Sequence, residues 1–174
     1  MSTTKSFCLL VIWLPCVCFA QSSLLTLAQR YADEGNYEEA IRLAIKAKDM
    51  HGSLYGTESP TYADALNHLA QYKLLVNDVE EALPVAQENV GVCERIFGTG
   101  HTNYAMALGT LAQCYHAADD YDSAIRSATA AKEILKKEAG TNNAHYASVV
   151  CNLSIYYYCC PLNFEIGGKS LVTC

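Results

Sequence analysis

The chain has 174 residues, 17% charged side chains and a formal net charge of −6 at pH 7. This length suits one compact domain or one short array of repeats. A nucleic-acid partner is not expected, because binding to phosphates needs clustered lysine and arginine, and the twelve basic residues form no such cluster.

Residues 1–20 have the composition of a secretory leader. Lys5 precedes an uncharged apolar run over residues 7–19, and small and polar residues follow the run. The run contains Pro15 and is shorter than the roughly 20 residues that span a bilayer. We therefore expect a cleaved signal peptide and an exported protein, either secreted or periplasmic. The alternative is an uncleaved membrane anchor, the one case in which we expect contact with a membrane.

The cysteines beyond the leader are Cys93, Cys114, Cys151, Cys159, Cys160 and Cys174. Their spacing contains no CxxC pair and no metal-ligand pattern. We interpret Cys114 and Cys151 as small residues that pack between helices, because free cysteine is often buried. A disulfide among the last three cysteines is the alternative.

The strongest pattern is an internal repeat with a step of 42 residues. A Gly-Thr pair followed by a Tyr-Ala pair recurs at this step; the glycines are Gly56, Gly98 and Gly140, and the tyrosines are Tyr62, Tyr104 and Tyr146. Two further repeat positions hold only leucine or only alanine, namely Leu27, Leu69, Leu111 and Leu153, and Ala40, Ala82 and Ala124. So many matches at one offset indicate repeated structural units.

Each unit contains two amphipathic helices. Apolar residues recur three and four positions apart, which is typical of a helix with one buried face. Turn-forming pairs divide the units at Gly35-Asn36, Asn77-Asp78 and Asp119-Asp120. The predicted helices, in chain order, cover residues 23–34, 37–54, 60–76, 79–96, 102–118, 121–138 and 144–158. We refer to the first helix of each pair as helix A and to the second as helix B.

Alanine recurs where the two helices of a pair must meet, at Ala28 and Ala40 and at their equivalents in later units. A larger side chain would force the helices apart, so alanine indicates close packing of helix A on helix B. One pair alone cannot bury both of its apolar faces, so stacked units share a continuous core. The sequence therefore predicts an all-α solenoid of antiparallel helix pairs.

The repeat resembles the tetratricopeptide (TPR) signature in the spacing of Leu24, Leu27, Ala28, Tyr31, Ala40, Ala44 and Ala47. The 42-residue step, the segment GNYEEAIRLA and the Gly-Thr turn are similar to the repeats of kinesin light chains. The resemblance covers residues 23–158, or about three and a half repeats. It implies a right-handed superhelix whose A helices line a concave groove for an extended peptide or a partner helix.

The resemblance also implies which side chains face this groove: Asn67, Gln71, Leu74, Met106, Gln113, His116, Ile155 and Tyr158. Asparagine and glutamine can both donate to and accept from a peptide backbone, which suits an extended ligand. The alternative interpretation is that these are ordinary polar positions on an exposed helix face. The groove lacks the lysine and arginine set with which some family members clamp a C-terminal carboxylate.

The pattern changes after residue 158. Pro161 and its neighbours replace the expected turn, and the segment LNFEIGGKS repeats GNYEEAIRL only in part. Gly167 and Gly168 fall where a helix should continue, at a cost of about 1 kcal/mol each relative to alanine. We therefore expect residues 159–174 to be a degraded or truncated repeat. An uncapped apolar face there would be open to a second copy of the chain, giving a homo-oligomer.

No active-site pattern is found in the sequence. The histidines are scattered, without an HExxH pair or a cysteine at ligand spacing; they are His51, His68, His101, His116 and His145. There is no glycine-rich phosphate loop and no GxSxG elbow. We therefore expect no enzyme activity, no cofactor and no metal. Two functions stay open: a scaffold that binds a protein or peptide in its groove, and a structural or oligomer-forming module that uses its C-terminal face.

Overall fold

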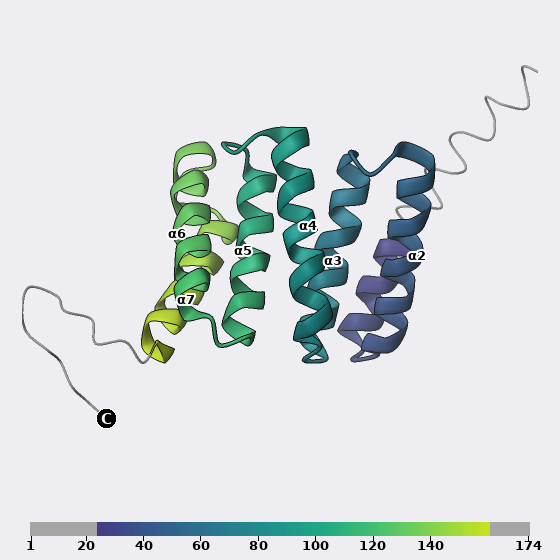
Figure 1. The fold of residues 1–174 in the computed structure, drawn as a ribbon, viewed down its shortest axis with the longest axis horizontal. Coiled ribbons are helices and arrows are strands. Elements are labelled where there is room, and N and C mark those ends of the chain that lie inside the picture. The colour runs from purple at the N-terminus through teal and green to yellow at the C-terminus, as the bar shows by residue number, and fades with distance from the viewer. Residues whose placement is uncertain (1–23, 161–174) are drawn as a thin grey trace, which may run out of the picture.

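The computed structural model describes residues 24–160 as one row of helices that follow each other in chain order (Figure 1). After helical residues 24–33 come α2 (Tyr37–Tyr55), α3 (Pro60–Leu75), α4 (Val79–Phe97), α5 (Thr102–Ala117), α6 (Tyr121–Glu138) and α7 (Ala144–Cys159). No strand occurs among the described residues. The all-α repeat solenoid is confirmed, and from α2 onward each helix end lies within one residue of its predicted place.

Two predictions concern segments beyond this range. The signal peptide predicted for residues 1–20 lies outside the described residues, and so does most of the degraded repeat predicted for residues 159–174. Both therefore stay predictions, and so does export. None of the helices within residues 24–160 is long and apolar enough to cross a membrane.

The turns inside the helix pairs all use the same two-residue arrangement. In the second unit, Asn77 has a φ of 60°, and a carboxylate oxygen of Asp78 accepts a hydrogen bond from the backbone N–H of Glu81. Asparagine tolerates this left-handed conformation, and the cap satisfies one of the unpaired N–H groups at the start of a helix. The equivalent residues in the other units are Gly35-Asn36 and Asp119-Asp120.

Fully buried alanines lie where the two helices of a pair cross. Ala28, Ala70 and Ala112 on A helices, and Ala40, Ala82 and Ala124 on B helices, all have no exposed surface. Because alanine ends at Cβ, the two backbones can approach closely, and neighbouring leucines fill the remaining space. The core around α6 includes residues of α5, α6 and α7, so each pair shares its core with the next A helix.

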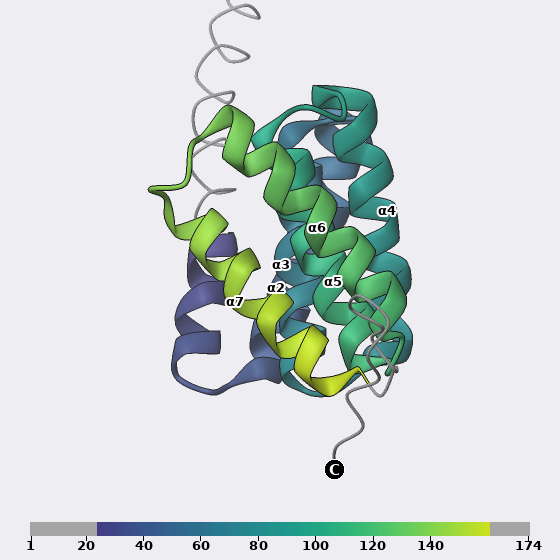
Figure 2. The ribbon, with the colours of Figure 1, turned by 90° about the vertical axis from the view of Figure 1, so that its left-hand side faces the viewer.

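The A helices form one continuous face of the array. Among the described residues, α3 contacts α5 and α5 contacts α7, whereas α2, α4 and α6 contact only A helices. Figure 2 looks along the row from its C-terminal side, with α6 and α7 nearest the viewer and the earlier pairs stacked behind them. Side chains from successive repeats can therefore meet on the A-helix face.

The cysteines agree with the prediction only in part. Cys114 is buried as expected, and desolvation raises the pKa of its thiol to about 12. Cys151 is exposed, so the prediction that it packs between helices is wrong. It occupies the repeat position of Gly109, which α7 covers, and no described helix covers α7 in the same way. The described cysteines are free thiols.

The substitution Ala128→Leu tests the importance of the alanine contacts. Ala128 lies on α6 and is 1% exposed, so the larger side chain should overpack the core and lower the free energy of unfolding by about 1–3 kcal/mol. Ala130→Leu, at an exposed position of the same helix, is the matched control and should change it by less than about 0.5 kcal/mol. Urea denaturation measures both. Equal stability of the two variants would contradict the role given to the alanines.

Candidate functional site

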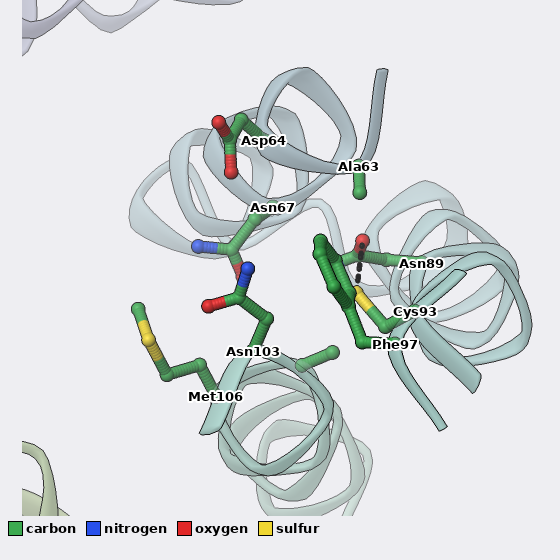
Figure 3. A pocket seen from close by; sticks show the side chains of 9 residues that line it. Ala63, Asp64, Asn67, Asn89, Cys93, Phe97, Asn103 and Met106 are labelled. Atoms are coloured by element: carbon green, nitrogen blue, oxygen red, sulfur yellow. Dashed lines mark hydrogen bonds between the residues drawn. The ribbon is translucent and has the colours of Figure 1, made fainter. Parts of the chain in front are cut away.

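Two adjoining cavities lie on the A-helix face. The first has a volume of about 40 Å³, lies between α3 and α5, and is backed by Cys93 and Phe97 of α4 (Figure 3). The second has a volume of about 130 Å³ and is lined by residues of α3, α5 and α7 and by Leu135 of α6. Asn67 and Met106 line both cavities, which together we call the amide groove. Its polar lining residues are Asp64, Asn67, Gln71, Asn89, Asn103, Thr110, Gln113, His145, Ser148 and Asn152.

Asparagine side chains dominate the first cavity. Figure 3 shows the amides of Asn67 on α3 and Asn103 on α5 pointing toward one another. Asn89 on α4 is 2% exposed, and its Oδ1 accepts a hydrogen bond of 3.5 Å from the thiol of Cys93. Because an amide carries both donors and an acceptor, this cavity can bind either kind of backbone group of a peptide.

A buried hydroxyl fixes the orientation of Asn67. Thr110, on α5, is 4% exposed, and its Oγ1 donates a hydrogen bond of 2.9 Å to Oδ1 of Asn67 on α3. Since this bond occupies the amide oxygen, the amide nitrogen of Asn67 is left to donate to a ligand. The groove therefore presents a hydrogen-bond donor in a fixed position between two repeats.

The groove carries little charge. Of the described residues that line it, Asp64 is the one carboxylate, and none is a lysine or arginine. Desolvation raises the pKa of Asp64, whereas the nearby His68 and His51 act in the opposite direction. Desolvation also lowers the pKa of His68, and the nearby Asp64 only partly opposes this effect. The lowered pKa favours the neutral imidazole at pH 7. The groove therefore offers mainly neutral hydrogen-bonding groups.

The structure brings four of the predicted groove residues together. Asn67 and Gln71 on α3, and Met106 and Gln113 on α5, all line the second cavity. They come from two successive repeats and face the same space. The remaining four predicted residues lie elsewhere.

Leu74 is partly buried and packs against the alanine-rich core between α3, α4 and α5. The ring of His116 lies 4.9 Å from the ring of Tyr156 on α7, so this side chain contributes to helix packing. Ile155 and Tyr158 are 45% and 92% exposed, and neither lines either of these two cavities. The structure does not bring these four residues to the groove.

Several lining residues were not predicted: Asp64, Asn89, Asn103, Gly109, Thr110, His145, Ser148 and Asn152. The 42-residue step contains a signal for some of them, because Asp64 and Ser148 occupy the same repeat position as Met106. Applying one repeat position consistently to every A helix would have found both. Asn89 lies on helix B and carries no such signal.

A metal site is not found within residues 24–160, where no three or more histidine, cysteine, aspartate or glutamate side chains are placed to hold an ion. His51 is buried, with 2% exposure, and its Nδ1 donates a hydrogen bond of 2.7 Å to the carbonyl oxygen of Thr61. This bond joins α2 to the start of α3, so the histidine has a structural role.

Comparison with known proteins identifies the family. A tetratricopeptide repeat family model matches residues 19–88 and 78–137, which is more than half of the chain. The chain belongs to the tetratricopeptide repeat family. No curated protein sequence matches it.

Solved TPR structures share the fold. A Podosopora anserina protein described as a kinesin light chain with nearly identical TPR-like repeats superposes with a TM-score of 0.73 at 20% identity, covering 79% of this chain and 65% of that one. BtubC (BKLC) from P. vanneervenii superposes with a TM-score of 0.71 at 21% identity, covering 80% of this chain and 56% of that one. The TPR chain therefore spans less than two thirds of either relative. The predicted kinesin light chain-like repeat fold is confirmed.

The substitution Thr110→Val tests the hydrogen bond that orients Asn67. Valine has nearly the shape of threonine but cannot donate, so the TPR chain should lose about 1 kcal/mol of unfolding free energy in urea denaturation. Thr110→Ser keeps the hydroxyl and is the matched control, which should retain most of the hydrogen-bond contribution. A loss in Thr110→Ser with none in Thr110→Val, which keeps the methyl group, would show that the methyl group, and not the hydrogen bond, matters here.

Proposed function

We propose that this TPR array binds an extended segment of a partner protein in the amide groove. One observation carries the proposal: two adjoining cavities lined by amides lie along the A-helix face, and no described helix covers them. The TPR fold is a non-catalytic scaffold for protein–protein interaction, which agrees with a binding role.

An extended peptide suits this groove better than a helix does. Each residue of an extended chain carries a free N–H donor and a free carbonyl acceptor, whereas most backbone groups of a helix are already paired. The amide nitrogen of Asn67 can donate to a peptide carbonyl, because Thr110 occupies its oxygen. Gln71 and Gln113 line the same cavity and add donors and acceptors on both sides.

Peptide display tests this function directly. The immobilised full chain selects binders from a random decapeptide library, and their affinities are then measured against single variants. Asn67→Ala and Gln113→Ala should each weaken binding about 3- to 10-fold, since each removes neutral hydrogen bonds. Gln87→Ala removes an exposed amide on α4, away from the groove, and should leave the affinity unchanged. Peptides that bind equally well to all three variants would contradict the groove as the binding site.

Self-association is a second candidate function, because large apolar side chains are exposed on α7. Ile155 and Tyr158 are 45% and 92% exposed near the end of the described array. Clustered apolar side chains at a surface are typical of an interaction site. A second copy of the chain could bury them in a symmetric dimer, in which the same surface of each copy takes part.

Light scattering of the full chain tests self-association. We expect the mass of a dimer, which the combined change Ile155→Ser and Tyr158→Ser should reduce to that of a monomer by removing the apolar contact. The control is the combined change Ile45→Ser and Leu54→Ser, at exposed apolar positions of α2 in the first repeat. A wild-type chain that stays monomeric at high concentration would contradict self-association.

A further inference from the structure

Gly109 opens the wall of the second cavity in the middle of α5. Its equivalents one repeat before and after, Asn67 and Cys151, both carry side chains. Glycine in a helix interior costs about 1 kcal/mol relative to alanine. Packing does not require it here, because a Cβ at this position would lie 3.5 Å from Cγ2 of Val149, an ordinary van der Waals contact. The structural effect of this glycine is therefore the space that it leaves.

We propose that this space is an anchor pocket for one uncharged apolar side chain of the bound peptide, of the size of leucine, methionine or phenylalanine. The inference rests on the proposed function, since it assumes that a peptide occupies the amide groove. The cavity measures about 130 Å³, close to the roughly 150 Å³ of an apolar cavity that holds benzene. One large apolar side chain therefore fits it, and a small side chain leaves much of it empty.

The lining of the pocket separates an apolar floor from a polar rim. Leu135 and Val149 line the cavity and are 0% and 7% exposed, so they lie at its buried end, together with Thr110, whose hydroxyl is already bonded to Asn67. Gln113 and Asn152 are only partly buried and lie nearer to solvent. An extended peptide can therefore pair its backbone with the amides of the rim while one of its side chains reaches the floor.

The lack of charged groups in the lining disfavours a charged side chain in this pocket. The described residues that line this cavity include no aspartate, glutamate, lysine or arginine, and its one imidazole, that of His145, is exposed. A charged side chain would lose its hydration on entering and find no partner of opposite charge.

The test uses peptides selected from the decapeptide library by the full wild-type chain. We expect the binders to share leucine, methionine or phenylalanine at one position, and alanine at that position to weaken binding at least about tenfold. Gly109→Leu fills the cavity from the protein side and should weaken the same peptides at least about tenfold. Gly109→Ala is the matched control, because its single methyl group makes an ordinary contact with Val149, and it should weaken binding less than about threefold.

The outcomes separate this inference from the proposed function. Peptides that depend on Asn67 but bind Gly109→Leu as well as wild type would overturn the anchor pocket and leave the groove assignment standing. A shared charged or amide side chain at the anchor position would also overturn it. A library that yields no binder would overturn both proposals. The alanine replacement in the peptide needs no protein variant, so the inference can be tested even if Gly109→Leu fails to fold.

Discussion

The contact between helix A and helix B at fully buried alanines determines the geometry of the array. At Ala70 and Ala82, for example, neither helix has a side chain beyond Cβ, so the two backbones come close. The same pair of residues recurs every 42 positions, which gives successive helix pairs the same shape. Identical pairs stack in a regular row, and the spacing of α3, α5 and α7 follows from that row.

This row also explains why side chains of several repeats meet on the A-helix face. The A helices contact one another, whereas among the described residues the B helices contact only A helices. Side chains of three repeats therefore meet on the A-helix face. The hydrogen bond from Thr110 to Asn67 joins two repeats in this way, so the position of the Asn67 amide depends on how the pairs stack. Stability of the core and geometry of the groove are thus coupled.

The sequence was sufficient for the helices and turns, because these depend on local patterns. Apolar spacing identifies a helix, and Asn77 followed by Asp78 identifies a turn and its cap wherever the pair occurs. The groove is different, because it depends on which neighbouring helix each side chain meets. His116 lies on the same helix as Gln113 but packs against Tyr156, and only the packed structure shows this.

The cavities, and the burial of residues at the end of the described array, could not be predicted from the sequence either. From the sequence, Gly109 is simply a glycine inside a helix. Its effect on the second cavity depends on the packing of α7 against α5, which the structure shows. Cysteine is a residue type that often packs between helices, yet Cys151 is exposed because no described helix covers it. Repeat patterns predict the units well, and the contacts between units require the structure.

The charged side chains of the chain lie mostly outside the groove. The net charge is −6, yet the groove contains a single carboxylate. The buried cation Lys73 pairs with Asp78 and Glu81 at the turn between α3 and α4, outside the groove. The described lining of the groove therefore offers few charged contacts to the peptide proposed to bind there. Under the proposed function, a charged ligand residue placed over Val149 would lose water without gaining a partner, and this desolvation penalty would select against such ligands.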